Sequence, residues 1–227
     1  MLRNPDFILY IASSFIIFAV AYVPATFLPD LMHEFKKSPK EVYICLMTMG
    51  LCDLVGRLLF GAFVHKMPRY MPFIHSAGVM LLSLSSGLII LSRSFGTFLI
   101  MSGILGLGLG CYAGMHFLMA TLLLPLDDVR FGYGIALTFG GIALVTGMPL
   151  AGFVTDSVKS EIGAFIFSSV LFFIGCFLEC IIGIREIFWK TSTEVKSRYN
   201  SATTDSDIKI QKDVTVINSV DIETTYM

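Results

Sequence analysis

Asp53 and Arg57 place an acid and a guanidinium inside an apolar stretch that runs from residue 42 to residue 64. Burying either charge at the centre of a membrane costs about 2.5–3.5 kcal/mol, so each charge needs a partner or a function. Their i, i+4 spacing puts both side chains on one face of a helix, where they can pair. A paired acid and guanidinium at membrane depth predicts a functional site. The alternative is a structural ion pair that locks two helices together.

The composition predicts a membrane protein. Hydrophobic residues make up 55% of the 227 residues and charged residues 15%, and the mean hydropathy is +0.78. Soluble domains carry about a quarter charged residues. The net charge of -1 gives no indication of a nucleic-acid partner. The cysteines lie in apolar stretches without metal-ligand spacing or a disulfide framework, which favours a role in apolar packing. They are Cys45, Cys52, Cys111, Cys176 and Cys180.

Six segments are long enough to cross about 30 Å of hydrocarbon. They lie near residues 7–32, 42–64, 72–92, 97–124, 132–155 and 163–184. Their apolar residues run continuously instead of alternating, which favours helices over a barrel. The first segment is too long for the apolar core of a signal peptide. Pro24 and Pro29 predict a kink or an early end within it. The fold class we expect is an all-α membrane protein with six transmembrane helices.

An even number of spans puts both termini on one side of the membrane. If that side is cytoplasmic, the inner flanks hold Arg3, Lys66, Arg69, Arg130, Arg185, Lys190, Lys196 and Arg198. The outer loops then hold Lys36, Lys37, Lys40, Arg93 and Lys159. Because basic residues concentrate in inner loops, this difference favours cytoplasmic termini. We expect a multi-pass protein of the plasma membrane.

A change in composition after the last span divides the chain into two parts. We expect residues 1–186 to form the membrane domain and residues 187–227 a disordered cytoplasmic tail. Residues 191–227 hold twelve Ser or Thr and few large apolar residues. Within the membrane domain, Gly-Ala-Phe-Val at 61–64 is similar to Ala-Gly-Phe-Val at 151–154. Each motif closes its span, which suggests a 3+3 inverted repeat.

The fourth span contains a stripe of glycines. Gly106, Gly110 and Gly114 recur every four residues and therefore share one helix face. Small residues on such a face let another helix backbone approach closely. The face serves either as a gating surface or as static packing, because sliding and close packing need the same shape.

Three further ionisable residues lie in apolar segments. His116 is either a proton relay in the pore or a hydrogen-bonded structural histidine. His75, near the cytoplasmic start of the third span, is assigned no role. Glu179 lies deep in the last span. We expect its side chain to extend toward the inner surface, as long charged side chains near helix ends do.

Three stretches of the chain resemble one family. Residues 50–61, Gly-Leu-Cys-Asp-Leu-Val-Gly-Arg-Leu-Leu-Phe-Gly, look like the eighth helix of the monocarboxylate transporters with its Asp-x-x-x-Arg pair. Residues 106–113, Gly-Leu-Gly-Leu-Gly-Cys-Tyr-Ala, look like the tenth helix, and residues 132–156 like the eleventh and its following loop. Roughly residues 4–186 therefore resemble the C-terminal half of a monocarboxylate transporter of the major facilitator superfamily. Met148 stands where that family has the first of two prolines, before Pro149.

The resemblance implies transport of a small carboxylate-bearing organic solute by alternating access, often together with a proton. In the family, the arginine that matches Arg57 contacts the substrate carboxylate. The aspartate that matches Asp53 takes part in proton coupling. Pro149 and the glycine stripe are candidates for gating or helix packing. The chain shows no nucleophile–base set, metal cluster or nucleotide motif. We therefore expect neither an enzyme nor a cofactor, and the implied partners are an organic anion, a proton and the lipid bilayer.

The resemblance covers six of the family's twelve spans, and a central site lies between the two halves of such transporters. We therefore interpret the chain as a fragment, a truncated form, an incomplete gene model or a half-transporter. It needs the missing N-terminal half or a second membrane chain. The alternative function is a non-transporting protein that pairs with or modulates a full-length relative. The substrate stays open among lactate-like acids, aromatic amino acids, creatine-like zwitterions and thyroid-hormone-like molecules.

We predict that single cysteines introduced at Lys37 and Arg130 react from opposite sides of the membrane. In oriented cells, a membrane-impermeant thiol reagent should label Lys37→Cys from outside and Arg130→Cys only after permeabilisation, because both termini are expected in the cytoplasm. The parent chain is the control for the native cysteines. Labelling of Lys37→Cys only from the cytoplasmic side would contradict the predicted orientation.

Overall fold

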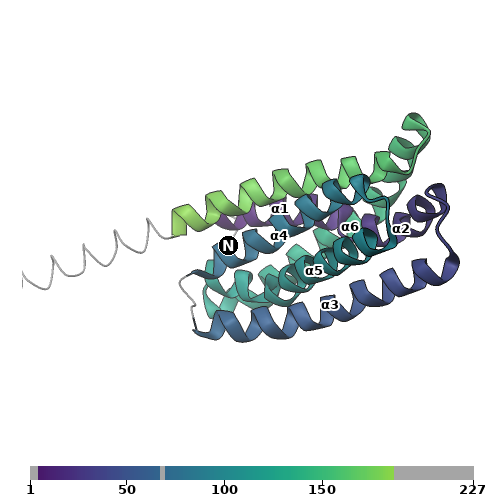
Figure 1. The fold of residues 1–227 in the computed structure, drawn as a ribbon. Helices are drawn as coiled ribbons and strands as arrows, with labels where there is room; N and C mark the ends of the chain where they lie inside the picture. The colour runs from purple at the N-terminus through teal and green to yellow at the C-terminus, as the bar shows by residue number, and fades with distance from the viewer. Residues whose placement is uncertain (1–4, 67–69, 187–227) are drawn as a thin grey trace, which may run out of the picture. The chain divides into compact units, whose positions relative to one another are not determined.

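The computed structural model describes residues 5–66 and 70–186 (Figure 1). The expected tail at 187–227 lies outside the described residues. Residues 5–66 and 70–183 belong to one compact unit. The arrangement described below is that of this unit.

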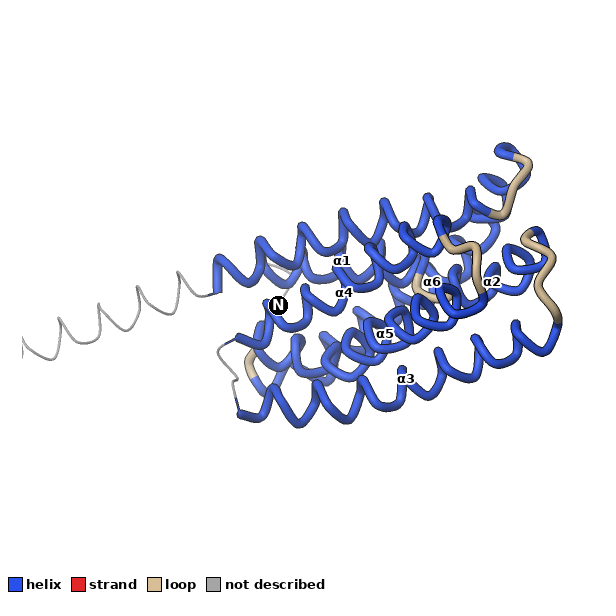
Figure 2. The backbone as a smooth tube through the Cα atoms, in the orientation of Figure 1, coloured by secondary structure: helices blue, strands red, loops and turns tan. Residues whose placement is uncertain are grey.

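The described residues form helices joined by short loops (Figure 2). The elements are α1 (Pro5–Val20), α2 (Val23–Glu34), α3 (Pro39–Lys66), α4 (Met71–Leu88), the 3₁₀ turn η2 (Ile89–Leu91), α5 (Phe95–Leu123) and α6 (Leu126–Val158). A last helix follows at Ile162–Glu186. Within the described ranges, six segments are long and apolar enough to cross a membrane. The expected all-α fold with six spans is confirmed.

The first span is interrupted where its prolines predicted a break. α1 ends at Val20, and two turn residues precede α2. The ring of Pro24 would clash with the carbonyl of Val20, four residues earlier, if the helix continued unchanged. Pro24 lies in the first turn of α2, where a backbone N–H would have no partner within the helix, so its missing N–H costs no hydrogen bond. Pro29 lies inside α2, which continues past it.

Helix α5 lies between α3 and α4 and packs against both (Figure 1). α1 packs along α6. The last helix joins α4 through a reciprocal serine contact. The Ser83 hydroxyl donates to the Ser169 carbonyl at 2.9 Å, and the Ser169 hydroxyl donates to the Ser83 carbonyl at 2.8 Å. Such contacts hold helices together where lipid provides no hydrophobic driving force between them.

α3 and α6 are the least covered spans of the unit. In the most apolar window of each span, 17% of the residues of α3 and 22% of those of α6 are buried, against 39–56% elsewhere. Their outward faces carry large apolar side chains, which include Tyr43, Met47, Leu51, Leu58, Phe131, Val145 and Phe153. These two faces are therefore built to meet lipid or another protein surface.

Candidate functional site

Asp53 and Arg57 form the ion pair that their spacing predicted. Both lie on α3, and Arg57 Nη2 is 3.0 Å from Asp53 Oδ2. Arg57 Nε also donates to both carboxylate oxygens at 3.2 Å. The Arg57 side chain is 43% exposed and that of Asp53 22%. Because both partners belong to one helix, this pair does not join two helices, and its charged groups remain accessible from outside the unit.

The glycine stripe of α5 packs against the backbone of α3 at the level of this pair. A Cβ at Gly106 would overlap the carbonyl of Met49, and one at Gly110 would overlap the carbonyl of Asp53. At Gly114, a Cβ would lie 3.2 Å from the Cα of Arg57. The glycines therefore let the two backbones touch at three successive turns. Close packing is present at this face, and movement along it stays a prediction.

His116 lies on a different side of α5 from Gly114, because two residues correspond to about 200° of rotation. It is 2% exposed. The Tyr10 hydroxyl from α1 lies 3.0 Å from His116 Nδ1 and donates to the His116 carbonyl at 2.8 Å. The aromatic rings of Phe18, Tyr112 and Tyr133 surround the imidazole. His116 is thus buried and hydrogen-bonded, and its proposed relay role is untested.

The expectation for Glu179 was wrong. Its side chain does not reach the surface but is 0% exposed, with Oε2 2.8 Å from Nδ1 of the equally buried His75. Sequence reasoning also missed His75. The available signal was their position, since both lie toward the predicted cytoplasmic ends of their spans and so at similar depth. Nothing in the sequence shows that α4 and the last helix are neighbours.

Pro149 lies inside α6 and is exposed, and the helix continues through it. Proline lacks an N–H, so the carbonyl of Val145 loses its usual helical partner. A role for Pro149 in gating stays a prediction.

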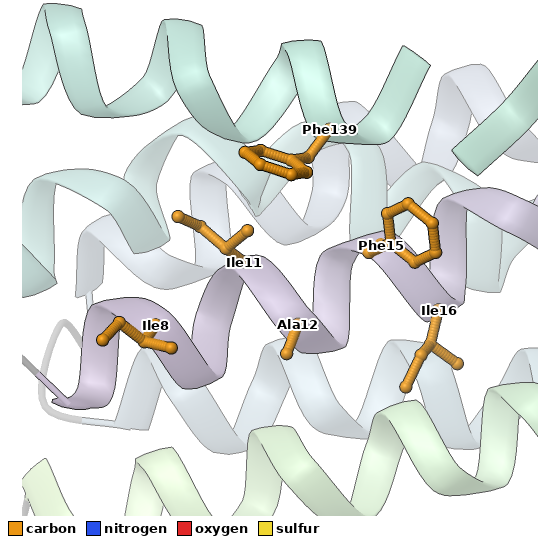
Figure 3. A pocket seen from close by; sticks show the side chains of 6 residues that line it. All are labelled: Ile8, Ile11, Ala12, Phe15, Ile16 and Phe139. Carbon is orange, nitrogen blue, oxygen red and sulfur yellow. The ribbon is translucent and has the colours of Figure 1, made fainter. Parts of the chain in front are cut away.

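An open groove of about 530 Å³ lies between α1 and α6 (Figure 3). It is lined by Ile8, Ile11, Ala12, Phe15, Ile16 and Phe139. All six side chains are apolar and supply no hydrogen-bonding group for a charged solute. The groove therefore suits lipid or an apolar protein surface better than a carboxylate.

Residues 10–208 match the family model described as the Major Facilitator Superfamily. This match covers most of the chain, and the chain belongs to that superfamily. It is 31% identical to human monocarboxylate transporter 10 over 166 residues, which are 71% of this chain and 32% of that protein. It is 24% identical to mouse monocarboxylate transporter 3 over 214 residues, 91% of this chain and 43% of that protein. The chain thus spans about a third to under half of the curated relatives it matches.

We predict that Gly110→Ala destabilises the unit and that Gly61→Ala does not. An added Cβ at Gly110 meets the α3 backbone, and overpacking of this kind costs about 1–3 kcal/mol. At Gly61 nothing lies within 4 Å of the added Cβ. There, alanine should gain up to about 1 kcal/mol of helix propensity. Thermal unfolding of both variants in the same detergent is the measurement. Equal stability of the two variants would contradict the close contact.

Proposed function

We propose that this chain supplies the C-terminal half of a transporter that moves a small carboxylate-bearing organic solute together with a proton by alternating access. The observation that carries the proposal is the accessible Asp53–Arg57 pair in the otherwise apolar middle of α3. Membership of the superfamily and similarity to proteins named monocarboxylate transporters support it.

Arg57 is proposed to bind the carboxylate of the solute. A guanidinium presents a planar fork of N–H donors that matches the two oxygens of a carboxylate. In the structure that fork already holds such a group, because Nε and Nη2 donate to Asp53. A substrate carboxylate would replace the Asp53 carboxylate at the same donors.

Asp53 is proposed to take up the proton when the substrate claims Arg57. Deprived of its cationic partner, a carboxylate in apolar surroundings favours its neutral form. The loaded site would then hold one neutral acid and one neutralised guanidinium. In apolar surroundings, a site without net charge has a lower free-energy cost than a site with net charge. Binding of the anion and of the proton are thereby coupled through Arg57.

The other half of the transporter is proposed to cover the exposed faces of α3 and α6. The Arg57 side chain faces outward from the unit, so the chain alone does not enclose a site around it. The second candidate is a protein that does not transport. It would use the same exposed faces to pair with a full-length relative. Its support is the set of large apolar side chains exposed on α3 and α6, which a partner chain would cover.

We predict that Arg57→Lys, in a complete transporter that contains this chain, weakens carboxylate affinity about ten- to a hundredfold. Lysine keeps the charge but loses the fork, and a charged hydrogen bond contributes about 1.5–3 kcal/mol. Concentration-dependent uptake is the measurement. Arg130→Lys, at an exposed position near the start of α6, is the matched control.

Asp53→Asn in the same transporter should abolish the stimulation of uptake by a pH gradient while exchange without a gradient continues. Asparagine keeps the size of the side chain and removes the group that titrates. Surface expression is checked first, because the change leaves Arg57 without its counter-ion. Normal pH-stimulated uptake by both Arg57→Lys and Asp53→Asn at normal surface levels would make the pair structural.

The chain by itself is predicted not to transport. Liposomes that contain only the purified monomeric chain should take up radiolabelled monocarboxylates no faster than empty liposomes. Adding a separately expressed N-terminal half should restore uptake if the chain is half of a transporter. If the chain instead modulates a relative, the added half restores nothing, and uptake by a co-reconstituted full-length relative changes. Uptake by the chain alone would refute the proposed division of the site.

A further inference from the structure

We propose that His75 and Glu179 form an occluded proton-binding site in the core of the unit, and that the pair carries one titratable proton, on the imidazole or on the carboxyl group. This site is separate from the Asp53–Arg57 pair and does not depend on the proposed transport function. It joins α4 to the last helix.

The geometry places two ionisable groups together and away from the surface. His75 Nδ1 lies 2.8 Å from Glu179 Oε2, and both side chains are 0% exposed. Neither ring nitrogen of His75 and neither carboxyl oxygen of Glu179 makes an aligned hydrogen bond. The contact is therefore a close approach of two ionisable groups. A charge on either side chain is balanced by an opposite charge on the other.

The surroundings of the pair are neutral or apolar in character. Glu179 interacts electrostatically with Tyr10, Tyr112, Cys111 and Cys176, which come from α1, α5 and the last helix. Tyrosine and cysteine side chains are ordinarily neutral near pH 7. The His75 ring stacks on Tyr112 with centroids 5.0 Å apart. These neighbours leave the charge of the pair to be balanced within the pair itself.

His116 and Tyr133 are the other titratable groups in this part of the core. The His116 ring centroid lies 6.4 Å from that of His75 and 5.7 Å from that of Tyr133 on α6. The two histidines interact electrostatically, so a charge on either opposes a charge on the other. His116 already has Tyr10 as its hydrogen-bonding partner. Glu179 is thus the balancing group for His75.

Counting protons shows which state this environment favours. With no titratable proton beyond the N–H of a neutral imidazole, the pair is a neutral imidazole beside a carboxylate and has a net charge of minus one. With two protons, it is an imidazolium beside a neutral acid and has a net charge of plus one. With one proton, the pair has no net charge, whether the proton lies on nitrogen or on oxygen. An uncompensated charge in the interior is far more costly than a balanced pair, so the one-proton state is the favoured one.

Burial also traps the proton. Because neither side chain reaches solvent in this conformation, exchange with the aqueous phase requires α4 and the last helix to separate or water to enter between them. The Ser83–Ser169 contact closes the same pair of helices further along. The proton is therefore released only when this helix pair opens or water enters between the two helices.

The test counts the protons on the pair directly in the full chain, reconstituted in lipid nanodiscs. Nitrogen NMR with labelled histidine reports the state of His75, and infrared spectroscopy with labelled glutamate reports the Glu179 carboxyl. The expected result is one titratable proton on the pair at about pH 7. His33 is exposed and serves as the internal comparison.

Variants assign the signals. Glu179→Gln keeps the shape of the side chain and should remove one bound proton per chain, leaving a neutral His75 at the same pH. His75→Gln identifies the His75 signal, and His33→Gln is the matched control that leaves the pair unchanged. The proton count of the parent chain needs no variant, so a variant that fails to fold does not remove the test.

Three results would overturn the proposal. The first is a neutral His75 beside an ionised Glu179 at about pH 7. The second is an imidazolium at His75 beside a neutral Glu179 acid at the same pH. The third is an unchanged His75 imidazolium in a folded Glu179→Gln variant, which would show that Glu179 is not its partner.

Discussion

Charge in an apolar interior must be neutralised nearby, and this constraint organises the polar groups of the unit. Two acids inside the spans meet two different bases, Asp53 with Arg57 and Glu179 with His75. The pairs differ in what surrounds them. Arg57 is partly exposed on an outer helix, whereas His75 and Glu179 are fully enclosed. The same requirement thus produces one pair that is partly open to its surroundings and one that is enclosed.

Helix α5 separates these two environments. One of its faces is lined by glycines, and another carries aromatic and polar side chains. Its glycines bring the backbone of α3 into contact at Asp53 and Arg57. Tyr112 and His116 lie among the polar and aromatic groups of the core on another part of its surface. A larger residue in the stripe would move the whole α3 backbone, since the atoms it meets are mainly backbone. The position of Asp53 and Arg57 therefore depends on the glycines of this α5 face, which carry no side chains.

Local patterns in the sequence predicted the features that depend on neighbouring residues. Hydropathy predicted six spans, Pro24 and Pro29 predicted a kink or an early end in the first one, and the i, i+4 spacing paired Asp53 with Arg57. The His75–Glu179 pair escaped prediction because its residues come from helices far apart in the chain. Glycine spacing showed that α5 has a smooth face, but it did not show that α3 is the helix packed there. Which helices are neighbours is a tertiary property that periodicity in one segment does not encode.

The geometry of Asp53 and Arg57 bears on the two interpretations that their spacing left open. A pair that locks two helices needs one partner on each, and both residues lie on α3. The nearest face of α5 offers glycines, which bring no side-chain acceptor to the guanidinium. Arginine has five N–H donors, and the contacts to Asp53 use only Nε and Nη2. The other donors need oxygen atoms from water, a solute or a covering protein, because hydrocarbon supplies none. A partly exposed guanidinium with donors to spare is better suited to binding an anion than to fixing helices, and this favours the functional interpretation.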